Sequence, residues 1–290
     1  MAEIDLSVRA RVQDAAARLA VAGVTDPVVD AELLLAHVRD ESRGALAAAA
    51  IRGDLLTPDD AARFDALVAR RAAREPLQHL TGLAPFRHLE LEVGPGVFVP
   101  RPETEIVAQL AIDLLFADAS PEPIAVDLCT GSGAIALALA TEVPHARVHG
   151  VELSPEAFAY TLRNRERIGA ENLTLVQGDF ADAFPELDGA VTVVVSNPPY
   201  VPADAIPRDP EVRLHDPALA LYSGEDGLDA IRVLSRTALR LARPGGSVVI
   251  EHGEWQGEAV RAILASDGWR AAATHPDLAQ RDRVTTALRP

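Results

Sequence analysis

The sequence predicts an α/β protein in which a doubly wound parallel sheet follows a small all-helical domain and a β-hairpin linker. Three observations predict this fold class. From about residue 120 onward, short apolar runs alternate with longer segments of helical periodicity, as in a parallel sheet with crossover helices. Up to about residue 74, the chain shows helical periodicity instead. Between these regions, apolar alternation surrounds a Gly-Pro-Gly turn.

The composition indicates a folded protein with one large domain and one small one. The chain has 290 residues, of which 48% are hydrophobic and 24% charged, enough to bury a sizeable core. Its single cysteine, Cys129, excludes an intrachain disulfide and a cysteine-based zinc cluster, and it favours a reducing compartment. We therefore expect a cytoplasmic protein without a metal site.

The sequence also argues against membrane and nucleic-acid binding. Its start, residues 1–5, has neither the basic region nor the long apolar core of a signal peptide. The longest apolar stretch, residues 45–51, is too short to span a membrane. A formal charge of −16 argues against a general nucleic-acid binder, which needs a basic surface. We expect a monomer that binds neither DNA nor membranes.

Residues 1–76 are predicted to form the helical domain. The first helix has Val8, Val12 and Leu19 on one face, and Gly23 can close it. Two further helix starts are marked by a capping residue followed by proline at the first helical position. These starts are Asp26-Pro27, ahead of Leu34, Leu35 and Val38, and Thr57-Pro58, ahead of Phe64, Leu67 and Val68.

Residues 77–101 are predicted to form the hairpin linker. Apolar residues alternate from 86 to 93 as in a strand, residues 94–96 favour a turn, and residues 97–99 would form the second strand. After this linker, Pro102 precedes acidic residues and an apolar helical pattern, so a helix should start there.

The third part of the chain, residues 102–290, alternates strands and helices. Strands are expected at 124–128, 147–151, 173–177, 191–196 and 247–251, with 269–274 and 284–288 closing the sheet. Helices fit 134–142, 155–168, 228–241 and 257–266. This alternation predicts the doubly wound sheet, and such sheets bind ligands at the carboxyl ends of their strands.

A glycine-rich loop joins the first strand of that sheet to its helix. In this loop, Gly131 and Gly133 let the backbone come close to a ligand, and the helix N-terminus offers free N–H groups. With Ala136, the spacing satisfies the relaxed dinucleotide fingerprint. These features fit either a nicotinamide enzyme or an S-adenosylmethionine enzyme.

Acidic side chains favour S-adenosylmethionine. Glu152, at the end of the second strand, can accept both ribose hydroxyls, while Asp127 suits a cationic amino-acid group and would repel a pyrophosphate. Asp179 and Phe180, after the third strand, suit the amino group and face of adenine. We expect the cofactor to contact Asp127, Cys129, Thr130, Gly131, Ser132, Gly133, Glu152, Asp179, Phe180 and Asn197.

A stiff polar turn, Asn197-Pro198-Pro199-Tyr200, follows the strand predicted at 191–196. Two prolines cannot continue a central strand, so the chain turns at the carboxyl edge of the sheet. The Asn197 side-chain oxygen and the Pro198 carbonyl can grip one NH₂ group, and the Tyr200 ring can pack on its planar group. The predicted chemistry is transfer to an amide or amino nitrogen, with Asn197, Pro198 and Tyr200 as catalytic residues.

Taken together, these motifs resemble the class I S-adenosylmethionine-dependent methyltransferases. The chain is most similar to the protein-glutamine N5-methyltransferases that modify peptide-chain release factors, and the resemblance covers nearly all of it. The motifs that carry it lie at residues 75–82, 98–105, 127–133, 197–200, 224–228 and 281–284. Any one of these motifs is weak evidence, but the set in this order is highly specific.

The resemblance implies a Rossmann-like methyltransferase sheet with S-adenosylmethionine as the methyl donor. It implies that the acceptor is the glutamine of the Gly-Gly-Gln loop in class 1 release factors, and that the helical domain helps to dock that protein. We expect the substrate to contact Phe98, Arg101, Asn197, Pro198, Pro199 and Tyr200.

Three alternatives stay open. Some glutamine methyltransferases modify a ribosomal protein, and adenine-N6 DNA methyltransferases use a related turn because adenine also offers a planar NH₂. The acidic charge and the short helical extra domain weigh against DNA. A non-catalytic S-adenosylmethionine-binding scaffold is disfavoured by the intact turn at 197–200.

The sequence departs from the family pattern at two places. Cys129 stands at a position that is usually glycine. Residues 251–254, Glu-His-Gly-Glu, replace a more apolar Glu-Ile-Gly-Tyr, and we assign this segment no chemistry.

Overall fold

The computed structural model describes residues 5–290. The expectation that no signal peptide is present concerns residues 1–5, which apart from Asp5 lie outside the described residues. The chain divides into two compact units: Met1–Leu83 with Pro207–His215, called here the helical unit, and Ala84–Ile206 with Asp216–Pro290, called the sheet unit. No helix within residues 5–290 is both long and apolar enough to cross a membrane.

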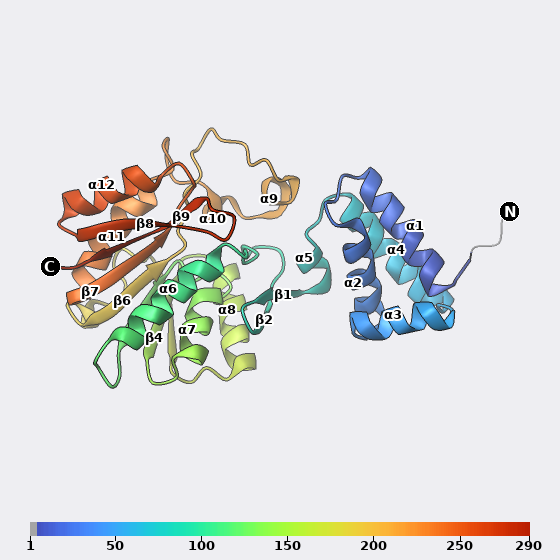
Figure 1. Cartoon of the computed structure of the whole chain (residues 1–290), viewed down its shortest axis with the longest axis horizontal. Coiled ribbons are helices and arrows are strands. Elements are labelled where there is room, and N and C mark those ends of the chain that lie inside the picture. Colours follow the sequence, from blue (N-terminus) through green and yellow to red (C-terminus); the bar gives the residue numbers. More distant parts are fainter. Residues whose placement is uncertain (1–4) are drawn as a thin grey trace. The chain divides into compact units, whose positions relative to one another are not determined.

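The helical unit confirms the three predicted helices and adds others. Its helices are α1 Val8–Val21, α2 Pro27–Arg39, α3 Arg43–Arg52, α4 Pro58–Ala72, α5 Leu77–Thr81 and α9 Pro210–His215 (Figure 1). Leu19, Leu34, Phe64 and Val68 form part of its buried core. The sequence did not predict α3, whose alanine-rich sequence has weak periodicity, or α9. Helix α5 was not predicted either, because its residues were assigned to the hairpin linker.

Of the two predicted capping residues in this unit, Thr57 makes the expected hydrogen bond and Asp26 does not. The Thr57 hydroxyl accepts the Asp60 N–H over 3.1 Å and caps α4. Asp26 precedes Pro27 as predicted, but its side chain makes no capping hydrogen bond to α2. Proline at the first helical position still fits this start because its missing N–H would have had no partner there.

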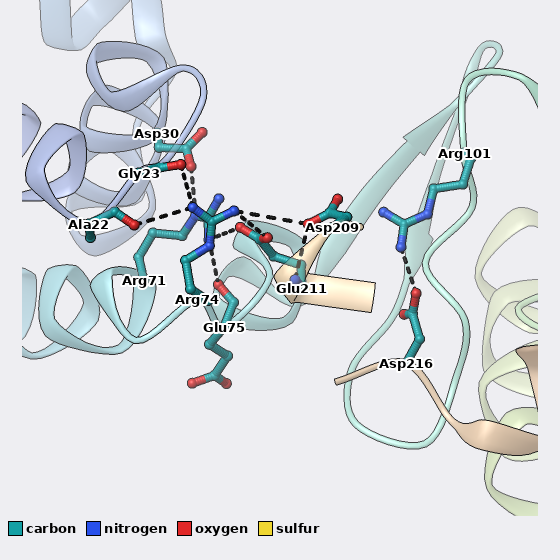
Figure 2. A network of polar contacts seen from close by, with 10 residues as sticks. All are labelled: Ala22, Gly23, Asp30, Arg71, Arg74, Glu75, Arg101, Asp209, Glu211 and Asp216. Carbon is teal, nitrogen blue, oxygen red and sulfur yellow. Dashed lines mark hydrogen bonds and ion pairs between the residues drawn. The ribbon is translucent and has the colours of Figure 1, made fainter. Parts of the chain in front are cut away.

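Two arginines anchor the segment Pro207–His215 within the helical unit, although it lies far along the chain from the other helices (Figure 2). Arg71 Nη1 lies 2.7 Å from Glu211 Oε1, and Arg74 Nη2 lies 2.5 Å from Glu211 Oε2. Arg71 Nε also pairs with Asp30 Oδ2 on α2 at 2.6 Å. These charge-assisted hydrogen bonds hold α9 to α4 and α2.

The sheet unit contains a seven-stranded sheet in the order β5-β4-β3-β6-β7-β9-β8. Its strands are β3 Ile124–Leu128, β4 Arg147–Glu152, β5 Leu173–Gln177, β6 Val191–Ser196, β7 Ala242–Glu251, β8 Arg270–Pro276 and β9 Asp282–Leu288. The five strands from β5 to β7 are parallel, as predicted. The last two differ from the predicted parallel sheet because β9 runs antiparallel to both β7 and β8.

Helices cover both faces of this sheet, which confirms the doubly wound prediction (Figure 1). Residues alternate along each strand, so Ala125 and Val193 pack on one face while Val126 and Val194 pack on the other. The first face carries α6 Thr104–Ala117, α7 Ala134–Glu142 and α8 Pro155–Ile168, and the second carries α11 Asp229–Leu241 and α12 Gly257–Asp267. A further short helix, α10 Ala218–Leu221, was not predicted.

The predicted hairpin is present, but its turn lies at residues 87–88 and not at residues 94–96. Its strands are β1 Leu83–Phe86 and β2 Leu89–Glu92, paired in a two-stranded sheet. The prediction of a strand at 97–99 was therefore wrong, because Arg87 adopts φ 53° and makes the reversal before the Gly-Pro-Gly sequence is reached. Val97 and Val99 are buried as loop residues. Likewise, α6 begins at Thr104 and not at Pro102, since residues 102–103 still form a turn.

Candidate active site

The candidate site lies at the carboxyl ends of the adjacent strands β3 and β6, where the order of the strands along the sheet reverses. After β3 the chain winds outward to β4 and β5, and after β6 it winds the opposite way to β7. Leu128 at the end of β3 is paired in register with Ser196 at the end of β6, and the Ser196 hydroxyl donates to the Leu128 carbonyl. The glycine loop and the turn at Asn197 therefore begin side by side, at the position where doubly wound folds bind ligands.

The turn Asn197-Pro198-Pro199-Tyr200 offers two hydrogen-bond acceptors. Asn197 Nδ2 donates to Thr104 Oγ1 over 3.2 Å, which leaves Oδ1 on the other end of the carboxamide. Among the described residues, neither Asn197 Oδ1 nor the Pro198 carbonyl accepts a hydrogen bond. The arrangement can chemically hold the two protons of one NH₂ group.

Tyr200 is held from both its ends. Its hydroxyl donates to Glu251 Oε1 at the end of β7 over 3.2 Å, and its ring packs partly against the core. Its carbonyl accepts from Gln256 Nε2 over 3.0 Å. Burial and the neighbouring Glu251 carboxylate raise the pKa of the Tyr200 phenol, so it remains a proton donor at neutral pH.

A glycine of the motif at 224–228 makes room for this turn. Gly227 has φ +76°, and a Cβ added to it would lie 2.3 Å from the Tyr200 carbonyl oxygen. A side chain at 227 would therefore push the turn out of position. The Gly-Glu-Asp-Gly-Leu segment supports the turn by this close approach.

Asp127 is the most deeply buried acid of the glycine loop. It is 1% exposed, and its Oδ2 accepts the Ala136 N–H of α7 over 3.1 Å. Its other oxygen, Oδ1, is buried without a hydrogen-bond partner among residues 5–290. Burial raises the pKa of Asp127 to about 8, against the effect of the Ala136 N–H, and the Glu152 carboxylate adds to the rise. A buried acceptor without a partner fits a ligand that brings a donor or a cation.

Glu152 lies across the loop from Asp127 and helps to shape it. Its Oε2 accepts the Gly131 N–H and its Oε1 accepts the Ser154 N–H, both over 2.8 Å. Burial raises the pKa of Glu152, while these N–H groups oppose the rise. Each carboxylate oxygen has a second lone pair, so both can still accept from a ligand.

Cys129 occupies a backbone conformation that favours glycine. Its φ is +69°, in the left-handed region that costs a residue with a Cβ about 1–2 kcal/mol. This value explains physically why a glycine would suit the position. Burial and the carboxylates of Glu152 and Asp127 raise the pKa of the thiol, so Cys129 carries no thiolate at neutral pH.

Side chains of α8 hold the glycine loop through its carbonyl groups. Thr161 Oγ1 donates to the Gly131 carbonyl over 2.5 Å. Asn164 Nδ2 donates to the Ser132 carbonyl over 2.9 Å and to the Glu92 carbonyl over 3.0 Å. Gly131 itself has φ +60°, and a Cβ added there would meet no atom within 4 Å. The loop therefore stays open on the Gly131 side while its other side is fixed.

Of the remaining predicted cofactor residues, Thr130, Ser132 and Gly133 belong to the glycine loop, and Asp179 and Phe180 follow β5. The Thr130 hydroxyl donates to the Asp127 carbonyl over 3.1 Å, and Ser132 is 3% exposed. Gly133 has φ +91° and begins α7. Asp179 is exposed and its Oδ1 accepts the Ala181 N–H, while Phe180 packs partly against the core.

Phe98 and Arg101, both predicted to contact substrate, form a pair of their own. The Arg101 guanidinium lies 5.1 Å from the centre of the Phe98 ring. Arg101 Nη2 also pairs with Asp216 Oδ2 at 2.7 Å, and the Asp216 side chain is fully buried (Figure 2). Arg101 thus fixes the point where the chain returns to the sheet unit, and part of its charge is already compensated.

Four residues near the turn were missed by the sequence analysis: Thr104, Gly227, Glu251 and Gln256. Glu251 lies in the segment to which the sequence analysis assigned no chemistry, yet it accepts the Tyr200 hydroxyl. Thr104 could have been suspected because it follows the Pro-Arg-Pro-Glu run. Gln256 carries no sequence signal, since only the fold brings it to the Tyr200 carbonyl.

Comparison with known proteins identifies two family domains in the chain. Residues 12–82 match a family model described as the PrmC N-terminal domain, and residues 121–278 match one described as a methyltransferase domain. A solved methyltransferase from Pyrococcus furiosus has a TM-score of 0.50 at 18% identity, covering 77% of this chain and 96% of that one. This likeness shows the same fold.

Curated relatives match over almost their whole length. The release factor glutamine methyltransferase of Streptomyces coelicolor is 56% identical over 283 residues, which cover 96% of both chains. The 4-amino-L-phenylalanine/4-methylamino-L-phenylalanine methyltransferase of Streptomyces pristinaespiralis is 42% identical over 282 residues, which cover 95% of this chain and 93% of the relative. The chain belongs to the release factor glutamine methyltransferase family.

Proposed function

We propose that this protein transfers a methyl group from S-adenosylmethionine to N5, the side-chain amide nitrogen, of the glutamine in the Gly-Gly-Gln motif of class 1 release factors. One observation carries the proposal: Asn197 Oδ1 and the Pro198 carbonyl, acceptors without partners among the described residues, lie beside the glycine loop. The name of the Streptomyces coelicolor relative supports the choice of a release factor as substrate.

The residues around the glycine loop fit the proposed cofactor. Asp127, with its buried oxygen Oδ1, would hold the cationic amino-acid group, and Glu152 would accept the ribose hydroxyls. Gly131 leaves the loop open to the ligand, and Asp179 with Phe180 would lie at the adenine. When bound, S-adenosylmethionine supplies a methyl group on a sulfonium, which is a strong electrophile.

Positioning is the main task of the protein in this reaction. An amide nitrogen is a weak nucleophile because its lone pair is delocalised into the carbonyl group. Asn197 Oδ1 and the Pro198 carbonyl would accept the two N–H protons and fix the nitrogen in one orientation. Both oxygens would also stabilise the positive charge that develops on the nitrogen. The methylated nitrogen is strongly acidic, so it loses its extra proton without a dedicated base.

The rest of the chain has proposed roles in holding the protein substrate. We assign docking of the release factor to the helical domain, residues 1–76, linked by residues 77–101 to a methyltransferase domain, residues 102–290. Phe98, Arg101, Pro199 and Tyr200 would line the approach to Asn197. A release factor acts in translation, so we place the enzyme in the cytoplasm. We also propose that it is a monomer.

A different acceptor is suggested by one relative. The Streptomyces pristinaespiralis protein is named for an aromatic amino acid with a free amino group, which is also a planar NH₂. A ribosomal-protein glutamine or a DNA adenine would meet the same two acceptors. The acidic sequence disfavours DNA.

The decisive experiment offers these acceptors separately. Purified class 1 release factor, 4-amino-L-phenylalanine, ribosomal protein and DNA would each be incubated with the protein and methyl-labelled cofactor. Mass spectrometry is expected to find one added methyl group on the Gly-Gly-Gln glutamine. Label on any of the other three acceptors, with none on the release factor, would reject the proposal in favour of that acceptor.

Replacing Asn197 with alanine tests the role of the turn. The loss of one oriented acceptor is expected to reduce kcat by roughly 100- to 1,000-fold, as for other preorganised polar contacts to a developing charge. The affinity for S-adenosylmethionine, measured by calorimetry, should change little. The exposed Asp204→Asn substitution in the following loop serves as the control with unchanged kcat. An equal loss of cofactor affinity and kcat in Asn197→Ala would contradict the assignment.

A further inference from the structure

The side chain of Gln256 joins three segments around the candidate site. Its Oε1 accepts the Gly253 N–H, just after β7, over 2.8 Å. Its Nε2 donates to the Tyr200 carbonyl over 3.0 Å and to the Asp226 carbonyl over 3.2 Å. The carboxamide therefore uses its acceptor and both of its donors. Only this orientation fits, because the reversed carboxamide would place Oε1 against two carbonyl oxygens and Nε2 against an N–H.

The backbone of Gln256 is held as well as its side chain. Gln256 lies directly before α12, and its N–H donates to the Gly253 carbonyl over 2.9 Å. Its carbonyl accepts the Val260 N–H over 2.9 Å, and Val260 and Leu264 pack α12 into the core. The fit is close, since a Cβ added to Gly227 would lie 2.9 Å from Gln256 Nε2. The two side-chain donors of Gln256 are thus fixed in place by the fold.

The turn after β6 has few other restraints on its main chain. Pro198 and Pro199 have no N–H to donate. Among the described residues, the bond from Gln256 to the Tyr200 carbonyl is the one hydrogen bond to a main-chain atom of residues 198–200. The two proline rings fix φ, and Pro199 restricts ψ of Pro198, so this stretch moves as a stiff unit. Anchoring Tyr200 therefore limits movement of the Pro198 carbonyl.

We propose that Gln256 is a positioning residue that holds the Pro198 carbonyl where it can accept an N–H of the substrate amide. Thr104 holds the other acceptor, since Asn197 Nδ2 donates to Thr104 Oγ1 over 3.2 Å. The two ends of the turn are thus anchored by different elements, Asn197 by α6 and Tyr200 by the residue before α12. This inference rests on the proposed function, in which Asn197 Oδ1 and the Pro198 carbonyl bind the two protons of one NH₂ group.

A role of Gln256 in folding alone would depend on a different atom of its side chain. The hydrogen bond that Oε1 accepts from Gly253 closes the loop between β7 and α12, whereas the bonds from Nε2 reach the turn and the segment at 224–228. Glutamate and methionine have nearly the length of glutamine and separate these contacts. Gln256→Glu keeps an oxygen for the Gly253 N–H but places a second oxygen against two carbonyls, while Gln256→Met keeps neither contact.

Methyl transfer to a purified class 1 release factor tests the inference, at about pH 8, where an introduced carboxyl group with an ordinary pKa of about 4.3 is ionised. Gln256→Met is expected to lower kcat by roughly 10-fold and Gln256→Glu by roughly 30- to 100-fold, because the nucleophile is no longer held in one orientation. The KM for the release factor should stay within about threefold and the Kd for S-adenosylmethionine within about twofold, since the lost interaction acts mainly in the transition state.

Glu258→Gln is the matched control, because Glu258 is exposed in the first turn of α12. It should keep the wild-type kcat, and thermal midpoints show whether each variant is folded. A role in folding alone predicts the opposite order, with Gln256→Glu close to wild type and Gln256→Met impaired. That order, or a wild-type kcat in both Gln256 variants, would overturn the inference.

A second measurement does not depend on the substrate. Tyr200 and Val201 form the only Tyr-Val pair in the sequence, so ¹³C-carbonyl tyrosine combined with ¹⁵N-valine gives a single NMR signal for the Tyr200 carbonyl. Loss of its hydrogen bond should move the carbonyl signal to lower frequency in Gln256→Met and leave it in place in Glu258→Gln. If the wild type leaves the release factor unmethylated while this signal moves, the proposed function fails and the anchoring of the turn stands. A signal that stays in place in Gln256→Met overturns the inference, whatever the substrate.

Discussion

At the scale of single residues, Asp127 combines two features that belong to ligand binding more than to stability. One of its oxygens is held by the Ala136 N–H, and the other is buried without a partner among residues 5–290. An acid in this state costs the free protein stability when it ionises, since burial disfavours its charge. A bound cation would remove that cost. Ionised Asp127 is therefore stabilised only when a cationic ligand is bound beside it.

This state of Asp127 predicts how cofactor affinity changes with pH. Burial raises the pKa of Asp127 to about 8, so below pH 8 the free protein holds a proton that a cationic ligand must displace. Affinity for S-adenosylmethionine should therefore rise as the pH increases toward 8, with proton release visible by calorimetry in buffers of different ionisation enthalpy.

Asp127→Asn is the matched control for that prediction, because the amino group of the ligand titrates in the same range, near pH 8. The variant should bind more weakly and should lose the part of the proton release that belongs to the protein. Identical proton release in wild type and Asp127→Asn would show that Asp127 stays ionised in the free protein.

The sequence could predict residues such as Asp127, Glu152 and Asn197 because each lies at or next to the end of a strand. Strand ends meet at one edge of a parallel sheet, so position along the chain predicts position in space. Glu251 also ends a strand, but its role depends on the Tyr200 hydroxyl, which lies 51 residues earlier. No local pattern predicts such a contact.

At the scale of elements, α8 has a second function besides covering the sheet. Its buried residue Asn164, 0% exposed, links β2 to the glycine loop through three hydrogen bonds. Asn164 Oδ1 accepts the Glu92 N–H over 2.6 Å, and Nδ2 donates to the carbonyls of Glu92 and Ser132. One side chain thus connects the hairpin to the candidate cofactor site.

Replacing Asn164 with alanine should destabilise the protein strongly. The change leaves the buried Ser132 carbonyl and the partly buried N–H and carbonyl of Glu92 without this partner, and one buried group left unpaired costs about 1–3 kcal/mol. We expect a loss of about 2–4 kcal/mol in the free energy of unfolding, measured with denaturant, together with weaker cofactor binding.

Glu166→Ala on the same helix is the control, because Glu166 is exposed and such substitutions change stability by about 0.5 kcal/mol or less. Equal effects of the two substitutions would mean that Asn164 contributes only helix propensity. No sequence pattern marks Asn164, because nothing in the helix around it distinguishes it from an ordinary polar residue.

Elements were predicted well where the sequence has one strong period and poorly where the backbone makes a special turn. The strand Ile124–Leu128 and the helix Pro155–Ile168 have the predicted bounds. The hairpin was misplaced because Arg87, a residue without turn character, adopts a positive φ. Helix α9 was missed since its anchor, Glu211, pairs with arginines more than 130 positions earlier, at separations of 140 and 137 residues.

At the scale of the whole molecule, the helical unit is built from two segments that are far apart along the chain. The segment Pro207–His215 belongs to the helical unit, although the residues before and after it belong to the sheet unit. Residues 201–206 connect this segment to the turn that ends at Tyr200. Its attachment depends on a buried cluster in which Glu211 meets both Arg71 and Arg74, with side chains between 8% and 17% exposed.

The Glu211 cluster predicts an acid-dependent loss of stability in the helical unit. Burial opposes ionisation of Glu211, but hydrogen bonds from the Arg74 and Arg71 guanidinium groups outweigh it and lower the pKa of Glu211 to about 2. A lowered carboxylate pKa stabilises the folded state above the unfolded-state value of about 4.3, and this stabilisation is lost as the pH falls toward 2. The wild type should therefore lose thermal stability over that interval.

The Glu211→Gln variant isolates this contribution. Above about pH 4.3 it should be less stable than wild type by a constant amount, because Arg74 loses its buried carboxylate partner and Arg71 keeps only the Asp30 carboxylate. Below that pH the two melting curves should converge, since protonated Glu211 also lacks its charge. Asp204→Asn, exposed and three positions before the segment begins, should follow the wild type throughout. A difference between wild type and Glu211→Gln that persists unchanged to pH 2 would mean that shape, and not charge, holds Pro207–His215 in the helical unit.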